Sequence, residues 1–141
     1  MHAIGKAAEL SGVKVTTIRY YEENGLMPPP LRTESGRRVY DKEAVDRLRF
    51  IRHARDLGFP VETIRGLIEL QHNPGADCAE ADRMASAHLG EVRNRIRQLR
   101  ALERELIRMI DACQGGVIAR CQVLACLGDH SHCESEHAAR T

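Results

Sequence analysis

The sequence predicts a mainly α-helical fold, in which a helix-turn-helix module with a β-hairpin is followed by one long helix and a short C-terminal loop. Three observations predict this fold. Apolar residues recur at helical spacing through the first 72 residues. Glycine and proline interrupt that pattern at short intervals. A coiled-coil-like apolar repeat then occupies residues 80–112. A chain of 141 residues can bury one modest helical core with an extension.

The first two expected helices have the spacing of a helix-turn-helix motif. Residues 3–10 form the first helix, Ser11-Gly12-Val13 form the turn, and residues 14–24 form the second helix. Gly25 suits the left-handed terminus of a helix, and the run Pro28-Pro29-Pro30 prevents any continuation. The second helix is therefore expected to end near Gly25.

Residues 31–40 predict a small β-hairpin, or wing. The pair Ser35-Gly36 is a turn signal, and the residues on either side alternate in character. The hairpin carries three arginines, Arg32, Arg37 and Arg38. The wing therefore adds positive charge next to the helix-turn-helix.

Two more helices complete the N-terminal module. Asp41 is expected to cap a helix that runs to about Leu57 and ends at Gly58. Pro60 begins the next helix, and Asn73-Pro74-Gly75 closes it. We therefore divide the chain into a winged helix-turn-helix domain at residues 1–72, a linker and dimerisation helix at 73–112, and a metal-binding loop, short helix and tail at 113–141.

The apolar repeat of the long helix advances by four and three residues alternately, as in a coiled coil. Its positions are Ala85, Leu89, Val92, Ile96, Leu99, Glu103, Leu106, Ile110 and Cys113. Glu103 interrupts the repeat, and the neighbouring Leu102 is a substitute. A long helix packed on its own domain is the alternative, but the remaining segments are too short to cover so long a stripe. We therefore expect an antiparallel coiled-coil homodimer.

A two-fold dimer with two helix-turn-helix units is expected to bind palindromic DNA, with the second helix of each unit in a major groove. On that helix Thr16, Thr17, Arg19 and Tyr20 are expected to face the duplex. Arginine reads guanine edges or holds phosphates, whereas tyrosine and threonine hydroxyls more often fix the register on the phosphates. The wing residues Arg32, Arg37 and Arg38 would add contacts to the DNA backbone or minor groove. A solvated surface position is the alternative for any single arginine.

These motifs resemble the winged helix-turn-helix of the MerR family of bacterial transcription regulators, and the resemblance covers nearly the whole chain. It rests on Ile18-Arg19-Tyr20-Tyr21-Glu22, on Gly25-Leu26 with the proline run, on Arg32 to Gly36-Arg37-Arg38-Val39-Tyr40, on Phe50-Ile51-Arg52 to Leu57-Gly58-Phe59, and on the long helix.

The resemblance implies both a DNA-binding set and a mode of action. It places Arg19, Tyr20, Tyr21, Arg37 and Tyr40 at the DNA. Family members bind a promoter with an over-long spacer, and on binding an effector they distort the DNA so that RNA polymerase engages both promoter elements. Such distortion costs roughly 1–6 kcal/mol, which a metal site can supply.

The cysteines indicate the effector. Cys78 and Cys113 lie 35 residues apart at the two ends of the long helix, about 50 Å at 1.5 Å per residue, so they cannot share an ion within one chain. An antiparallel dimer instead brings Cys78 from the partner protomer beside Cys113, and Cys121 follows eight residues later. We therefore expect a three-thiolate site, formed twice per dimer.

Thiolates select soft or borderline ions, and three negative sulfurs suit a divalent cation. We expect Zn(II) or Cd(II) first, with Pb(II) or Hg(II) as further candidates. The resemblance agrees, because copper-type members carry Ser at the position of Cys78; a Cu(I)-responsive regulator is the alternative.

Four more side chains are candidate additional ligands, which tetrahedral Zn(II) would use: Cys126, His130, His132 and Cys133. Cys126 is equally suited to a buried structural role, and the tail residues to a solvated one.

The charge and hydropathy of the chain indicate its location and exclude several other classes of protein. The formal net charge is only +1, so any basic surface must come from folding. No apolar run approaches the roughly 20 residues that cross a bilayer, and the N-terminus lacks a signal-peptide core; we expect a cytoplasmic protein with no membrane partner.

No catalytic motif indicates an enzyme. The spread of the cysteines argues against an iron-sulfur cluster, and a metal-buffering protein would not need the arginines. No organic effector is expected, because the C-terminal part is too short for the ligand-binding domain of drug-sensing relatives.

Overall fold

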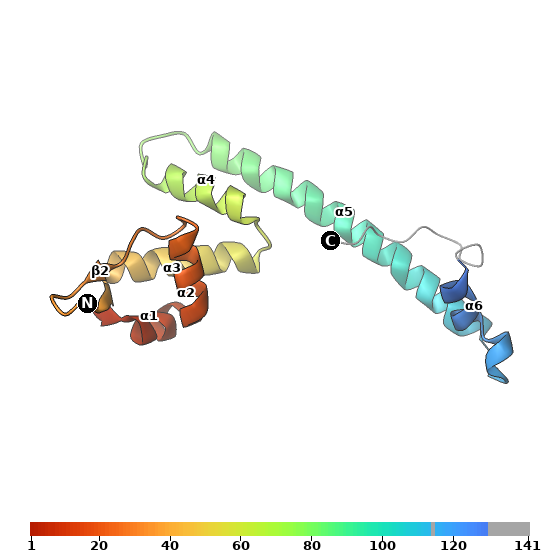
Figure 1. Cartoon of the computed structure of the whole chain (residues 1–141). Helices are drawn as coiled ribbons and strands as arrows, with labels where there is room; N and C mark the ends of the chain where they lie inside the picture. The colour runs from red at the N-terminus through yellow and green to blue at the C-terminus, as the bar shows by residue number, and fades with distance from the viewer. Residues whose placement is uncertain (114, 130–141) are drawn as a thin grey trace. The chain divides into compact units, whose positions relative to one another are not determined.

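The computed structural model describes residues 1–113 and 115–129. The predicted mainly helical fold with a wing and one long helix is confirmed (Figure 1). The chain divides into two compact units, Met1–Ala81 and Asp82–Thr141. The first unit contains all of the expected DNA-binding domain together with the loop and first residues of the long helix.

The helix-turn-helix consists of α1 (Ile4–Ser11) and α2 (Val15–Glu23). α1 ends at Gly12, which has a φ of 75° and donates its N–H to the Ala8 carbonyl at 2.8 Å. A Cβ atom on Gly12 would lie 2.0 Å from Nη1 of Arg52, but that atom is the far end of a flexible side chain that can shift, so the turn favours glycine mainly for its left-handed backbone conformation. The Ser11 hydroxyl accepts from the Val13 N–H at 3.2 Å and fixes the turn.

The wing is part of a three-stranded antiparallel sheet with the order β1-β3-β2. β2 (Leu31–Arg32) pairs with one edge of β3 (Arg38–Tyr40), as the hairpin prediction requires. The other edge of β3 pairs with β1 (His2–Ala3), a strand that the sequence did not predict. The central strand of the wing is therefore anchored to the chain just before α1.

α3 (Lys42–Asp56) and α4 (Val61–Gln71) follow the wing. The Asp41 carboxylate caps α3 by accepting from the Ala44 N–H at 2.9 Å. Gly58, with a φ of 87°, lies just after the end of α3. Both helices were predicted within about two residues, which is the usual uncertainty of helix ends.

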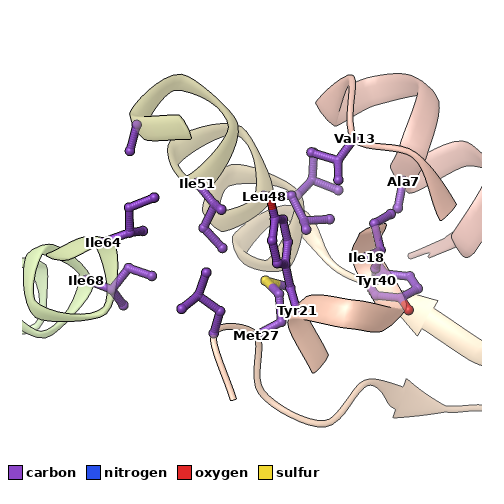
Figure 2. Close-up of a cluster of buried hydrophobic side chains, with 13 residues drawn as sticks. Ala7, Val13, Ile18, Tyr21, Met27, Tyr40, Leu48, Ile51, Ile64 and Ile68 are labelled. Atoms are coloured by element: carbon purple, nitrogen blue, oxygen red, sulfur yellow. The ribbon is translucent and has the colours of Figure 1, made fainter. Parts of the chain in front are cut away.

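The core of the first unit lies among α1, α2, α3, α4 and the wing (Figure 2). Ile18 of α2, Leu48 of α3 and Ile64 of α4 are each 0% exposed. Burial of one such side chain contributes about 1.5–3 kcal/mol. The whole buried set is Ala7, Val13, Ile18, Tyr21, Leu26, Met27, Tyr40, Val45, Leu48, Ile51, Ala54, Ile64 and Ile68. This core fixes α2, so the outer face of that helix is presented on a rigid support.

α5 (Ala79–Ala112) contains 34 residues. Most of the predicted seam is exposed in the single chain: Leu89, Val92, Ile96, Leu99, Leu106 and Ile110 are between 38% and 63% exposed. Among the described residues, no helix is both long and apolar enough to cross a membrane. α5 is followed by a 3-10 turn at Ile118–Arg120 and by α6 (Gln122–Gly128).

Candidate DNA interface and metal site

The outer face of α2 presents most of the side chains predicted to read DNA. The inward face is set by Ile18 and Tyr21, which are 0% and 7% exposed. Thr16 and Arg19 are exposed, and Tyr20 is 52% exposed although it is a large aromatic residue. Thr17 is partly buried. The outer face of α2 is therefore polar, cationic and aromatic, which suits contact with phosphates and base edges.

Tyr21, which the resemblance placed at the DNA, lies in the core beside α3 (Figure 2). Burial raises the pKa of Tyr21, and the nearby Arg55 guanidinium opposes that rise. The ring of Tyr21 supports Tyr20, with the two ring centroids 6.0 Å apart. Tyr21 thus lies behind the exposed face of α2.

The wing turn exposes two of its three arginines, Arg32 and Arg37. The Arg32 side chain donates from Nη1 to the Gly36 carbonyl at 2.8 Å. The Thr33 N–H donates to the Arg37 carbonyl at 2.9 Å, and this bond closes the turn. Arg37 therefore lies on an ordered turn with its side chain toward solvent.

The third wing arginine, Arg38, contacts Glu22 of α2 instead of lying fully in solvent. Its guanidinium forms an ion pair with Oε1 of Glu22. The hydroxyl of Tyr40, which is 1% exposed, donates to Oε2 of the same carboxylate at 2.9 Å. Burial and the bond to Glu22 raise the pKa of Tyr40 to about 12. Glu22 was not among the predicted site residues, although its position four residues after the buried Ile18 indicates the inner face of α2.

The described part of the metal site is a pair of thiols. The Sγ atoms of Cys113, at the end of α5, and Cys121, at the start of α6, lie 3.6 Å apart. Both cysteines are free and partly buried. Two thiolates bound to one tetrahedral ion at about 2.3 Å would have their sulfurs about 3.7 Å apart. The pair therefore fits two ligands of a common thiophilic ion.

The start of α6 favours the thiolate form of Cys121. Its pKa is lowered mainly by the Leu124 N–H, then by the Cys113 thiol, with a smaller contribution from the Val123 N–H; desolvation opposes these effects. A lowered pKa suits a metal ligand, because the thiolate is the form that binds metal.

Cys78, the predicted third ligand, is exposed in the loop before α5. Its neighbour Asp77 accepts from the Ala79 N–H at 2.9 Å and so orders the start of the helix. Cys78 also lines an apolar pocket of about 280 Å³, whose other walls include Phe50, Leu67 and Leu70. Within residues 1–113 and 115–129 of one chain, no three His, Cys, Asp or Glu side chains gather as a metal site.

Cys126 lies apart from the Cys113 and Cys121 pair. It is 5% exposed, and its Sγ lies 3.5 Å from Oε1 of the buried Glu105 of α5. Arg108 pairs with the same carboxylate at 2.8 Å. The burial of Cys126 agrees with the structural role that the sequence left open for it, whereas the contact with Glu105 was not predicted. The other candidate ligands, His130, His132 and Cys133, lie outside the described residues.

Comparison with known protein families matches two overlapping parts of the chain. Residues 3–71 match the family described as MerR HTH family regulatory protein. Residues 45–109 match the family described as MerR, DNA binding. The two matches together cover the helix-turn-helix, the wing, α3, α4 and most of α5.

Individual relatives extend the similarity to most of the chain. The HTH-type transcriptional regulator ZntR of Escherichia coli K12 is 42% identical over 116 residues, which are 82% of each chain. A probable heavy metal-dependent transcriptional regulator of Haemophilus influenzae is 37% identical over 121 residues, which are 86% of this chain and 94% of that one. The crystal structure of PbrR691 from Ralstonia metallidurans CH34 in complex with lead(II) has a TM-score of 0.78 and 36% identity, and the match covers 90% of this chain and 99% of that one.

Proposed function

Because the chain belongs to the MerR family of helix-turn-helix regulatory proteins, we propose that it is a transcription regulator that responds to a divalent soft metal ion. As a member of this family the protein is a DNA-binding regulator of transcription and not an enzyme. The proposal adds the metal class, the ligands and the way in which the ion changes the promoter.

The observation that carries the proposal is the 3.6 Å separation of the Cys113 and Cys121 sulfurs. Two thiols at this distance, one of them with a lowered pKa, form a preorganised pair of ligands. Two relatives support the assignment by name: one is called heavy metal-dependent, and PbrR691 is solved with lead(II).

The third ligand comes from a second copy of the chain. α5 exposes its apolar seam, and pairing two antiparallel α5 helices would cover it. The same pairing brings the partner's Cys78 to Cys113 and Cys121, because Cys78 and Cys113 flank the two ends of α5. Such a dimer contains two equivalent sites.

Three thiolates favour a divalent soft or borderline ion over hard ions such as Mg(II). Zn(II) and Cd(II) are the first candidates, and Pb(II) and Hg(II) are the next. Cys78 is the residue that argues against Cu(I), since a monovalent ion gains less from a third negative ligand.

At the promoter the exposed side chains of α2 and the wing would contact DNA in two successive half-sites. The predicted set remains Thr16, Thr17, Arg19, Tyr20, Tyr21, Arg32, Arg37, Arg38 and Tyr40. The exposed members, such as Arg19 and Arg37, would contact the duplex, and the buried members would support them. Closing a thiolate site between the two protomers would change the angle between their DNA-binding units and distort the spacer for RNA polymerase. Such a deformation costs roughly 1–6 kcal/mol.

Anaerobic metal competition tests the proposal. The reduced dimer receives Cu(I), Zn(II), Cd(II), Pb(II) and Hg(II) together, and native mass spectrometry identifies and counts the bound ions. We expect divalent ions at two or more per dimer, and their loss in Cys78→Ser. Ala76→Ser is the matched control, because it places the same side chain at a nearby exposed position of the loop.

Other outcomes would replace the proposal. Preference for Cu(I) that survives Cys78→Ser would indicate a copper-responsive regulator with Cys113 and Cys121 as the whole site. Metal binding without any effect on promoter DNA would indicate a metal-buffering protein. Absence of metal binding by the reduced dimer would contradict the metal-sensing function itself.

A further inference from the structure

The recognition helix α2 carries a carboxylate that points away from the expected DNA face. The Glu22 side chain is only 7% exposed. Carboxylates are rarely buried to this degree unless they are paired, and both partners of Glu22 belong to β3 of the wing. We propose that Glu22 is a positioning residue, which fixes the wing against α2 so that wing and helix contact one DNA duplex together. This inference rests on the proposed DNA-binding function.

The geometry makes Glu22 a two-point attachment. Arg38 pairs with Oε1, and the Tyr40 hydroxyl donates to Oε2 at 2.9 Å, so each carboxylate oxygen has its own partner. Two bonds to one planar carboxylate restrain orientation as well as distance. Because the Tyr40 ring is 1% exposed and packed in the core, the wing end of this attachment cannot move without disturbing the core.

The wing end is also held by its sheet. Arg38 and Tyr40 are the first and last residues of β3, the central strand between β1 and β2. A displacement of β3 relative to α2 therefore displaces the wing turn with Arg37. Glu22 thus acts on DNA through Arg37, while Arg38 and Tyr40 act by holding the wing rather than by direct contact.

The direction in which Glu22→Gln changes DNA affinity distinguishes a positioning role from a purely electrostatic one. A carboxylate near DNA repels phosphates, so neutralising it strengthens binding if charge alone decides. Positioning predicts the opposite for Glu22→Gln. The adjacent Glu23 is exposed, so Glu23→Gln makes the same charge change on the same helix and serves as the matched control.

The test measures the affinity of the full-length dimer for its operator by fluorescence anisotropy at several salt concentrations. We expect Glu22→Gln to weaken binding about tenfold, equivalent to about 1.4 kcal/mol, and Glu23→Gln to leave it unchanged or strengthen it. The slope of log K against log salt is expected to fall by about one unit in Glu22→Gln, as for the loss of one phosphate contact.

A double-mutant cycle identifies the residue through which Glu22 acts. In an Arg37→Ala background, Glu22→Gln is expected to cost less than about twofold, because the wing contact is already lost. In an Arg19→Ala background the full loss of about tenfold is expected to persist. Equal costs in both backgrounds, or a gain in affinity from Glu22→Gln, would overturn the inference.

The failure of the inference is distinguishable from the failure of the proposed function. If wild-type protein binds the operator and Arg19→Ala weakens it, DNA binding stands and only the role of Glu22 is in question. If Glu22→Gln does not fold, as judged by its thermal unfolding and metal stoichiometry, Tyr40→Phe replaces it. That variant keeps the ion pair and removes one hydrogen bond, and we expect the same dependence on Arg37 with a smaller loss; an unchanged affinity would contradict the inference.

Discussion

At the scale of single residues, Tyr40 shows how one side chain joins the core to the wing. Its ring is buried, and its hydroxyl reaches the carboxylate of Glu22. Ionised Tyr40 would lie against that negative charge in a poorly hydrated place, which is why its pKa rises to about 12. The residue is therefore a neutral hydrogen-bond donor at every physiological pH.

Replacing Tyr40 with Phe is expected to lower the free energy of unfolding by about 1.5–3 kcal/mol near neutral pH, since one hydrogen bond to a charged carboxylate is lost. The folded pKa lies above the ordinary value of 10.0. The bound proton therefore stabilises the folded state fully below pH 10, and this contribution declines as the pH rises toward 12. Urea unfolding of both proteins at about pH 8 and about pH 11 checks this, and we expect the difference to narrow at the higher pH.

Tyr20→Phe is the control for this measurement, because Tyr20 is 52% exposed on the same module. It is expected to change the stability little at either pH. A difference between wild type and Tyr40→Phe that grows with pH would contradict the assignment of the hydroxyl as a donor to Glu22.

At the scale of elements, α5 is the clearest case of a structure that needs a partner. Its seam residues Leu89, Ile96 and Leu99 are between 41% and 59% exposed. A helix of 34 residues with an uncovered apolar stripe indicates an interaction surface. The alternate spacing of four and three residues suits a second copy of the same helix.

Replacing Leu99 with Glu is expected to dissociate the dimer. Each dimer would lose two buried leucines, worth about 1.5 kcal/mol or more apiece, so the dimer affinity is expected to fall by at least about a hundredfold. Gln98→Glu places the same new charge on the neighbouring exposed position and is expected to leave the dimer intact. Sedimentation equilibrium checks both variants, and an unaffected dimer in Leu99→Glu would exclude this seam as the interface.

The elements differ in how far the sequence could predict them. α2, α3 and the hairpin carry local signals, such as the Asp41 cap and the left-handed Gly58, and they were predicted nearly to the residue. β1 has only two residues and exists because β3 offers it an edge, a tertiary cause that no local pattern contains. The candidate site could likewise be predicted only in part. The thiol ligands could be predicted because cysteine is a typical ligand of soft metal ions. The burial of Tyr21 and Tyr40 could not be predicted, because it depends on packing between segments that are distant in the sequence.

At the scale of the whole molecule, the proposed metal ligands are divided between the two units of the chain. Cys113 and Cys121 belong to Asp82–Thr141, whereas Cys78 belongs to Met1–Ala81, together with the predicted DNA contact Arg19. Communication between metal binding and DNA binding is then a coupling free energy between the two sites. Each activity should then be removable without the other.

We expect Cys121→Ser to abolish metal-induced transcription while operator affinity stays within about twofold of wild type. Arg19→Ala is expected to weaken operator binding by about tenfold or more, since one arginine contact to a base is worth about 1–3 kcal/mol, while metal stoichiometry is unchanged. Anisotropy, mass spectrometry and in vitro transcription give the three readouts. Retained induction in Cys121→Ser, or normal operator affinity in Arg19→Ala, would show that the corresponding site is assigned wrongly.

The placement of the tyrosines also makes the DNA-binding unit its own optical reporter. The chain has no tryptophan, and its three tyrosines are Tyr20, Tyr21 and Tyr40. All of its tyrosine fluorescence therefore originates between residues 20 and 40, and Tyr20 is exposed whereas Tyr21 and Tyr40 are buried. Quenching of this fluorescence by DNA would report binding of a duplex at α2. A change in tyrosine emission on adding a metal ion that does not absorb light would report, without any label, that metal binding alters the DNA-binding unit.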